Sequence, residues 1–476
     1  MVLIMVDPLA DSPALRDAGL RHNRNWLLMW FGQAVSALGD FVFTTTVVLW
    51  TGTVIAADQA WAPLAVGGVL IAAAVPIVLV GPIAGVYVDR WDRRRTMMVM
   101  DALRVVIVLA LLVVPAVGDR LTVAAQLVLV YVGVALSSAA AQFFNPARFG
   151  LLGAAVEPED QARAGALFQT SYSVAAVIGP PIAAPLLFSV GVQWAIGLNA
   201  ASFAASFLAL QAMRLHPAPR PDGDTDAAPA GDAVAQQAGF RQEMAEGFRF
   251  FVRSPVLRAA GTAVTIAMFG VGALNALDVF FVTDNLGVDA SWLGTLGGAF
   301  GIGSVVGALI ATAVATRFGA PRMFWTGMLL LGLFIIAYSR MTYLPAAIVV
   351  LALAGIPLSV VNAVSGPLVL AVTPVQMIGR VMAVLTPLMT VASMTSMAVA
   401  GWLASTLLRG FYVHLGPVAL GRIDVIFTVS GLMILAGGLW ASGPLRNLAS
   451  SAPAAESSAP LAPPADNDPD ADTARI

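Results

Sequence analysis

Twelve long apolar stretches restrict what this chain can fold into more than any other feature of its sequence. Each stretch is long enough to cross the hydrocarbon core of a bilayer, which takes about 20 helical residues at about 1.5 Å per residue. The composition agrees, because 59% of the 476 residues are hydrophobic and only 11% are charged. Such a chain lacks the polar side chains that cover a water-soluble globule. The sequence therefore predicts an all-α polytopic membrane protein with twelve transmembrane helices.

The composition also excludes several kinds of functional site. Cysteine is absent and only three histidines occur, so there is little basis for a metal site, and we expect no metal and no cofactor. Lysine is absent too, which excludes an ATP-binding loop of the Gly-x-x-x-x-Gly-Lys type. A net charge of -2 gives no basic surface for nucleic acid. No nucleophile with a base is visible, so we expect no catalytic residues and a protein that is not an enzyme.

The arginines predict how the helices are oriented. Short loops rich in positive charge stay on the cytoplasmic side of a membrane. If the N-terminus is cytoplasmic, only Arg120, Arg340, Arg409 and Arg422 fall outside, and Arg104 lies within the third apolar stretch. The opposite orientation would invert this count. We therefore expect a bacterial cytoplasmic-membrane protein with both termini inside.

The chain is expected to divide into two related halves. The segment HPAPRPDGDTDAAPAGDAVAQQAGF at the midpoint is rich in Pro, Ala, Asp and Gly, which is typical of a disordered linker. A weak parallel repeat pairs GVALS at 133 with GIPLS at 355, and many secondary carriers consist of two six-helix repeats. The expected segments are a cytoplasmic N-terminal segment (1–23), a six-helix bundle (24–213), a disordered linker (214–239), an interfacial amphipathic helix (240–254), a second six-helix bundle (255–446) and a disordered tail (447–476).

One short loop concentrates charge between the second and third apolar stretches, in the sequence GVYVDRWDRRRTMMVMD at residues 85–101. The simplest interpretation is an anchor that obeys the positive-inside rule. The order of residues suggests more, because Gly85 permits close helix approach and Asp89 can then meet an arginine or a helix N-terminus. Such a contact would hold the cytoplasmic face closed and would separate when that face opens.

This loop resembles the signature of the major facilitator superfamily, with Gly85, Asp89, Arg90, Arg93 and Arg94 at the expected spacing. The stretches WFGQAVSALGD in the first helix, FFNPAR at 143–148 and TPVQMIGRV at 373–381 are similar to the drug:proton antiporter branch, which includes macrolide and siderophore exporters. The resemblance implies the fold of that superfamily, with two six-helix pseudo-repeat halves. It also implies that Asp89 contacts the start of the eleventh helix, near Gly379 and Arg380.

Some positions depart from the family pattern. The fifth-helix antiporter motif is reduced to Gly179 and Pro180, with alanines in place of its other glycines. The fourth helix lacks the arginine that some proton-coupled drug exporters have there. In the second half, Thr316 stands where the loop aspartate would be. These differences weaken the inference about the coupling ion.

Acidic side chains inside the membrane are costly and are functional candidates by default. Asp40 is a candidate proton-coupling carboxylate or, equally, an acid held by hydrogen bonds to neighbouring helices. Asp278 is a second coupling candidate, with a solvated acid at the rim as the alternative. Asp101 and Arg104 are three residues apart near the membrane interface, where they can pair with each other or with the charged loop. We group them with the gating motif, in a structural role.

Uncharged polar residues at helical spacing form stripes that suit a large amphipathic substrate, although such stripes serve equally often in helix packing. The sequence thus predicts a monomeric exporter of bulky amphipathic drug-, macrolide- or siderophore-like molecules by alternating access, with protons and the lipid bilayer as its other partners. The alternatives are an importer, a lysolipid flippase, or a transport-silent sensor or partner subunit. The expected substrate-cavity residues are Gln33, Ser36, Phe43, Gln142, Asn145, Gln169, Asn275, Asn362, Met382, Thr386 and Met389.

Overall fold

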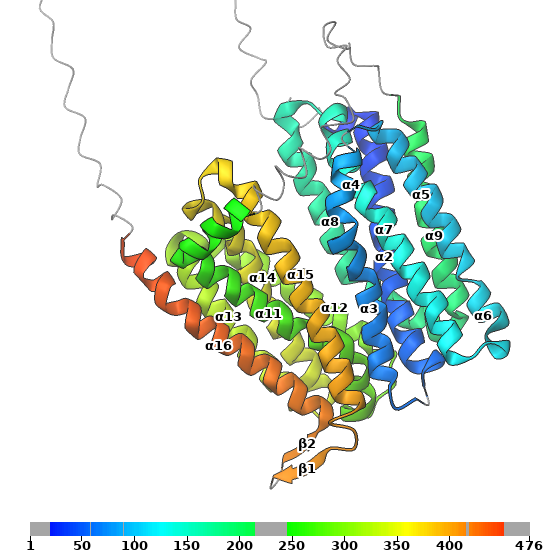
Figure 1. Ribbon diagram of the computed structural model, residues 1–476, viewed down its shortest axis with the longest axis vertical. Coiled ribbons are helices and arrows are strands. Elements are labelled where there is room, and N and C mark those ends of the chain that lie inside the picture. Colours follow the sequence, from blue (N-terminus) through cyan, green and yellow to red (C-terminus); the bar gives the residue numbers. More distant parts are fainter. Residues whose placement is uncertain (1–19, 58, 89, 215–244, 416–417, 452–476) are drawn as a thin grey trace, which may run out of the picture.

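Two bundles of helices make up the protein (Figure 1). The computed structural model describes residues 20–57, 59–88, 90–214, 245–415 and 418–451. Within these residues, 12 helices are long and apolar enough to cross a membrane. The predicted all-α polytopic fold is therefore confirmed.

The N-terminal half contains the first six spans. The second span (α3 and α4) and the third span (α5 and α6) are interrupted. The second span breaks at Val80, where Pro76 lies in the last turn of the preceding helix and Gly81-Pro82 begins the next one. Proline removes a backbone donor and favours such breaks. The elements are α2 (Arg24–Trp50), η1 (Thr51–Ile55), α3 (Ala62–Leu79), α4 (Gly81–Val88), α5 (Arg93–Ala110), α6 (Val113–Val117), η2 (Gly118–Arg120), α7 (Val123–Ala155), α8 (Pro158–Pro185), η3 (Leu186–Val190) and α9 (Val192–Ala212).

The C-terminal half repeats this plan and adds a small hairpin. Its elements are α11 (Pro255–Phe280), η4 (Phe281–Asn285), α12 (Trp292–Phe318), α13 (Ala320–Tyr338), α14 (Leu344–Val372), α15 (Val375–Ser405), β1 (Tyr412–Leu415), β2 (Val418–Gly421) and α16 (Arg422–Ser451). The antiparallel β1–β2 hairpin lies in a loop for which the sequence predicted no structure. Helix α16 continues to Ser451, so the predicted tail boundary at residue 447 was too early. The rest of that tail, the linker from residue 215 and most of the N-terminal segment lie outside the described residues.

Several helices begin where a side chain caps free backbone N–H groups. The Asn23 side chain accepts a hydrogen bond from the backbone of Trp26 at the start of α2, and Asp92 does the same for Arg95 at the start of α5. Thr122 and Ser254 cap α7 and α11. Caps of this kind contribute about 1 kcal/mol each and fix where a helix starts.

The predicted interfacial helix is described over residues 245–253, which are helical. Its Phe251 is buried against Leu257, Val381 and Leu385, whereas Phe248 is exposed. This short helix is therefore docked against α11 and α15.

Among the described residues, the main contacts between the two bundles lie near one end. We call the end with β1 and β2 the hairpin end, and the opposite end, with Arg93, Arg253 and Arg322, the arginine-rich end. Near the hairpin end, α3 packs on α15 and α8 packs on α12, while the bundles diverge toward the arginine-rich end (Figure 1). Glycines permit both contacts: a Cβ at Gly401 would lie 2.9 Å from the Pro63 carbonyl oxygen.

Candidate functional site: a one-sided opening and a buried charge cluster

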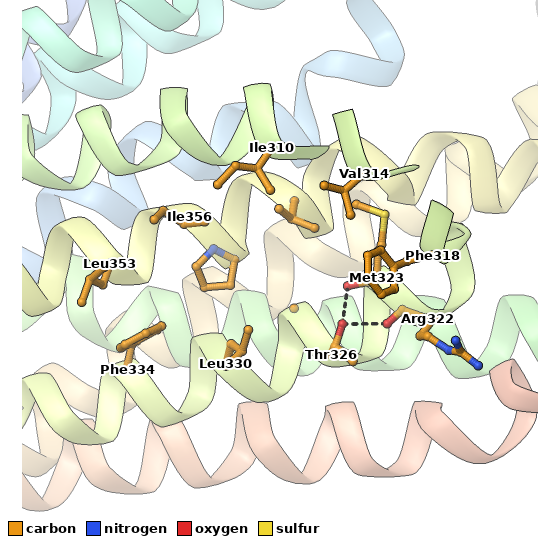
Figure 2. Close-up of a pocket in the computed structure, with 13 residues that line it drawn as sticks. Ile310, Val314, Phe318, Arg322, Met323, Thr326, Leu330, Phe334, Leu353 and Ile356 are labelled. Atoms are coloured by element: carbon orange, nitrogen blue, oxygen red, sulfur yellow. Dashed lines mark hydrogen bonds between the residues drawn. The ribbon is translucent and has the colours of Figure 1, made fainter. Parts of the chain in front are cut away.

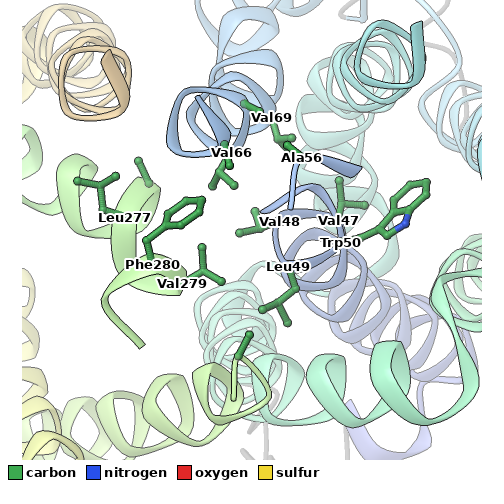
Figure 3. Packing of buried hydrophobic residues seen from close by; sticks show 14 of the residues in the cluster. Val47, Val48, Leu49, Trp50, Ala56, Val66, Val69, Leu277, Val279 and Phe280 are labelled. Carbon is green, nitrogen blue, oxygen red and sulfur yellow. The ribbon is translucent and has the colours of Figure 1, made fainter. Parts of the chain in front are cut away.

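A layer of buried apolar side chains closes the hairpin end, and we call this layer the apolar seal. It joins Val48 and Leu49 of α2 and Val66 of α3 to Val279 and Phe280 of α11, all of them buried (Figure 3). The seal spans both halves of the protein. These side chains offer a polar solute no hydrogen-bonding partner, so this layer disfavours its passage in the observed conformation.

Six of the predicted cavity residues are exposed, and all lie on helices rather than loops. Their side chains are accessible to a solute or to lipid, so their role in substrate binding stays a prediction. Gln142 and Met389 are half-buried, and Gln142 donates a hydrogen bond to the Ser138 carbonyl on its own helix. The exposed residues are Asn145, Gln169, Asn275, Asn362, Met382 and Thr386.

The remaining three predicted cavity residues occupy packing positions instead. Gln33 is buried and donates a hydrogen bond to Ser206 Oγ at 3.2 Å, which joins α2 to α9. Ser36 is buried on the same helix, and Phe43 lies in the cluster that includes the apolar seal. The expectation that they line a cavity does not fit this conformation, because helical spacing alone does not reveal which face meets a neighbouring helix.

A cluster of charges lies inside the N-terminal half, where α2, α5 and α9 meet. Arg104 donates to Asp40 Oδ2 at 2.8 Å, and its guanidinium lies 3.8 Å from the centre of the Phe203 ring. The Arg104 side chain is only 8% exposed, whereas that of Asp40 is 40% exposed. Asp40 therefore faces an accessible space while its cationic partner is held within the bundle.

Asp101 completes this cluster and is fully buried. Ser206 lies beside it, yet within the described part of the chain neither carboxylate oxygen makes a hydrogen bond of normal geometry. The expected pairing of Asp101 and Arg104 with each other or with the loop is thus replaced by a contact from Arg104 to α2. Sequence spacing could not show this, because Asp40 and Arg104 are 64 positions apart.

The cluster has two carboxylates and one guanidinium. Tyr172 of α8 also lies near Asp40, and Arg148 of α7 lies near Tyr172. A net negative charge in a buried site is costly, so it would be offset by a proton bound to one carboxylate or by the nearby charge of Arg148. The arrangement can therefore bind and release a proton without a metal or cofactor. Among the described residues, no group of three or more acidic or histidine side chains is placed to hold a metal ion.

The charged loop stabilises the N-terminal half in this conformation. Arg93 donates to the Gly150 carbonyl at 3.0 Å, and Arg94 donates to the Leu210 and Gln211 carbonyls at 2.8 Å each. Arg94 thereby satisfies free carbonyls at the C-terminus of α9. The predicted close approach at Gly85 is absent here, since a Cβ there would have no neighbour within 4 Å.

The predicted contact between this loop and the start of α15 stays untested, because Asp89 lies outside the described residues. Arg90 is exposed at the same loop. On the other half, Arg380 donates to Glu246 of the short 245–253 helix at 2.6 Å. Arg380 is therefore already engaged within its own half in this conformation.

The fifth-helix motif lies where three helices meet. A Cβ at Gly179 would be 2.5 Å from Phe41 Cβ, so this glycine permits α8 to pack closely on α2. Pro180 faces α12, where a Cβ at Gly294 would be 2.6 Å from the Pro180 carbonyl oxygen. The motif thus joins the N-terminal half to the C-terminal half.

Asp278 is held inside the C-terminal half. It accepts a hydrogen bond from the hydroxyl of Tyr338 at 2.8 Å, and the Tyr338 ring packs against Phe281 and Phe427. Tyr338 is fully buried. The alternative of a solvated rim acid does not fit these contacts, which connect α11 to α13.

Comparison with known proteins shows which protein family the chain matches. A sequence model of the Major Facilitator Superfamily matches residues 29–283 and 262–464. An uncharacterised MFS-type transporter of Bacillus subtilis is 25% identical over 423 residues, covering 87% of this chain and 90% of the relative. The multidrug efflux pump Tap of Mycolicibacterium fortuitum is 26% identical over 353 residues, covering 71% of this chain and 80% of that pump.

Solved structures show the same fold. A bacterial homologue of the human lysosomal transporter Spinster, crystallised in an inward-facing and unoccupied conformation, is similar with a TM-score of 0.64 and 16% identity. The match covers 91% of this chain and 99% of that one. At this identity the likeness concerns the fold alone.

Proposed function

Because the chain belongs to the Major Facilitator Superfamily, we propose that it exports bulky amphipathic small molecules by alternating access in exchange for protons. The substrates would be of the drug, macrolide or siderophore kind. The observation that supports this proposal is a half-exposed carboxylate paired with a buried arginine in a protein that is sealed at one end and divided at the other. The similarity to a multidrug efflux pump supports the substrate class.

The positive-inside rule assigns the arginine-rich end to the cytoplasm. The start of α2 and the end of α16 both lie at that end, so both termini are cytoplasmic in this proposal (Figure 1). In a bacterial cytoplasmic membrane the observed conformation is then the one that admits substrate from the inside. One chain contains both halves, so a monomer suffices.

The charge cluster couples this movement to protons. One proton is shared by Asp40 and Asp101 around Arg104, and it enters from the outside when the seal opens. Its release to the cytoplasm restores the net negative charge that the buried site disfavours. One charge moving through 100 mV is worth about 2.3 kcal/mol, which supports roughly fiftyfold concentration of a neutral substrate. Asp278, bonded to Tyr338, has a structural role in this scheme.

Export is tested by loading a pump-deficient bacterial host with a fluorescent amphipathic cation or a macrolide and following retention. Wild-type protein lowers retention, and an uncoupler abolishes the effect. Asp40→Asn and Asp101→Asn abolish it as well. Asp289→Asn is the matched control, because Asp289 is an exposed acid outside the membrane spans, and hydrogen bonds from the Ser291 side chain and backbone hold its pKa below the usual value.

Proton exchange is measured directly in inside-out vesicles with a pH-sensitive dye. Adding substrate dissipates a preformed proton gradient with wild-type protein and with Asp289→Asn, and not with Asp101→Asn. Raised retention in the wild-type host would indicate import instead. Unchanged retention with movement of a fluorescent lysolipid between leaflets would indicate a flippase, and either result refutes the proposal.

A further inference from the structure

An apolar groove runs along the outer surface of the C-terminal half, where α12 and α13 separate. Gly303 and Gly307 let α12 lie directly on the backbone of α14. Helix α13 packs against α14 and α16 but makes few contacts with α12. The space between α12 and α13 is therefore left open, with α14 as its floor.

The groove has a cavity volume of about 540 Å³, within the range of ligand-binding pockets. Figure 2 shows Ile310 and Val314 of α12 on one side and Leu330 and Phe334 of α13 on the other, with Leu353 and Ile356 of α14 between them. The hydroxyl of Thr326 is occupied, because it donates to the Arg322 carbonyl of its own helix at 2.8 Å. The walls thus offer hydrocarbon contacts to an occupant.

The groove ends in positive charge at the arginine-rich end. Arg322 lines this end, and Arg317 lies in the last turn of α12, directly before the groove-lining Phe318. Both are exposed, and neither makes an ion pair within the part of the chain that the structure describes. Helix α13 begins at Ala320, so the positive end of its dipole adds to the field at this mouth.

We propose that this groove binds an anionic phospholipid, with an acyl chain between α12 and α13 and the phosphate against Arg322 and Arg317. The length agrees with one leaflet. Arg322 and Phe334 are twelve residues apart on α13, about 18 Å at 1.5 Å per residue, and half of a bilayer core is about 15 Å. A lipid fits better than a protein helix, because the apolar walls lead to a cationic mouth where a phosphate can pair with Arg322.

Native mass spectrometry of the detergent-solubilised full chain tests the proposal. Phosphatidylglycerol and phosphatidylcholine with the same acyl chains are added at equal concentration. We expect more phosphatidylglycerol adducts on wild-type protein, and roughly fivefold weaker retention for each of Arg322→Gln and Arg317→Gln. Arg253→Gln is the matched control, because Arg253 is exposed at the same end and lies away from the groove. Equal retention of both lipids, or equal loss with Arg253→Gln, would overturn the proposal.

A second measurement needs no variant. Wild-type protein in liposomes is photolabelled with phosphatidylglycerol that has a diazirine on one acyl chain, and the labelled peptides are mapped. The label is expected on residues 310–334 and 353–360, and excess unlabelled phosphatidylglycerol removes it while phosphatidylcholine does not. Label spread evenly over the outer faces of α5, α9 and α16 would refute a built site. Loss of transport is not a readout here, so this test is independent of the proposed function.

Discussion

Substitution of Gly294 by valine acts directly on the contact between the two halves. A Cβ at this position would lie 2.6 Å from the Pro180 carbonyl oxygen and 2.9 Å from the Pro181 Cα. These neighbours are backbone atoms of α8, so they cannot move away by a change of rotamer. The clash exists only while the hairpin end is closed, because α8 and α12 belong to different halves.

The expected magnitude follows from the cost of overpacking, about 1–3 kcal/mol. The clash raises the free energy of the closed conformation only. It therefore shifts the ratio of molecules with a closed hairpin end to molecules with an open one. A difference of 1–3 kcal/mol corresponds to a change of roughly five- to 150-fold in that ratio. The fold of each half should be unaffected.

Spin labels measure the shift. The chain contains no native cysteine, so Arg120→Cys and Thr342→Cys introduce the only two thiols, one on each half at the exposed hairpin end. Double electron–electron resonance should show one main distance in the parent protein and added longer distances with Gly294→Val. Gly197→Val is the control, because a Cβ at Gly197 in α9 has no neighbour within 4 Å.

An unchanged distance distribution in folded Gly294→Val protein would refute the inference that this contact closes the hairpin end. The same shift in Gly197→Val would also refute it, because it would make the effect a general response to valine. Thermal unfolding of both variants separates a conformational shift from loss of fold.

Four further substitutions test the contacts inside each half. Arg104→Gln should lower the free energy of unfolding by about 1–3 kcal/mol, because it removes the partner of Asp40 and a cation beside Asp101. Asp40→Asn should cost less, because an amide oxygen still accepts from Arg104. Thermal unfolding in detergent compares the two variants. Tyr338→Phe should cost about 1–3 kcal/mol by leaving Asp278 without its hydrogen bond, and no loss of thermal stability would contradict the buried contact. Glu246→Gln should change stability by less than about 1 kcal/mol, because both members of its pair with Arg380 are more than a third exposed, and a large drop in melting temperature would contradict this.

The membrane spans could be predicted because the signal is local. An apolar stretch long enough to cross a bilayer must form a helix there, since only a helix satisfies its backbone groups in lipid. Close packing through the α12 glycines also follows from composition, and Gly294, Gly303 and Gly307 do meet neighbouring backbone or proline atoms. The β1–β2 hairpin was missed, because YVHL and VALG are too short to separate from a loop.

The contacts within the charge cluster could not be predicted from local sequence patterns. Asp40 was recognisable as an intramembrane acid, and Asp101 and Arg104 were placed near the interface, where they could pair with each other or with the charged loop. In the structure Arg104 pairs with Asp40 of α2, and among the described residues Asp101 is buried with Ser206 beside it and no hydrogen bond of normal geometry. Gln33, Ser36 and Phe43 are buried in this conformation, and their role as cavity residues stays a prediction, because a polar or aromatic stripe looks the same whether it faces a cavity or a helix.

By itself the sequence determined the twelve spans, their division into halves and the residues available for chemistry, because these depend on the transfer of each segment from water into lipid. Only the tertiary structure decided which end of the protein is sealed, which carboxylate meets Arg104, and where α12 and α13 separate. Those outcomes depend on the rotation and tilt of each helix, which are fixed by the combined packing of all its neighbours.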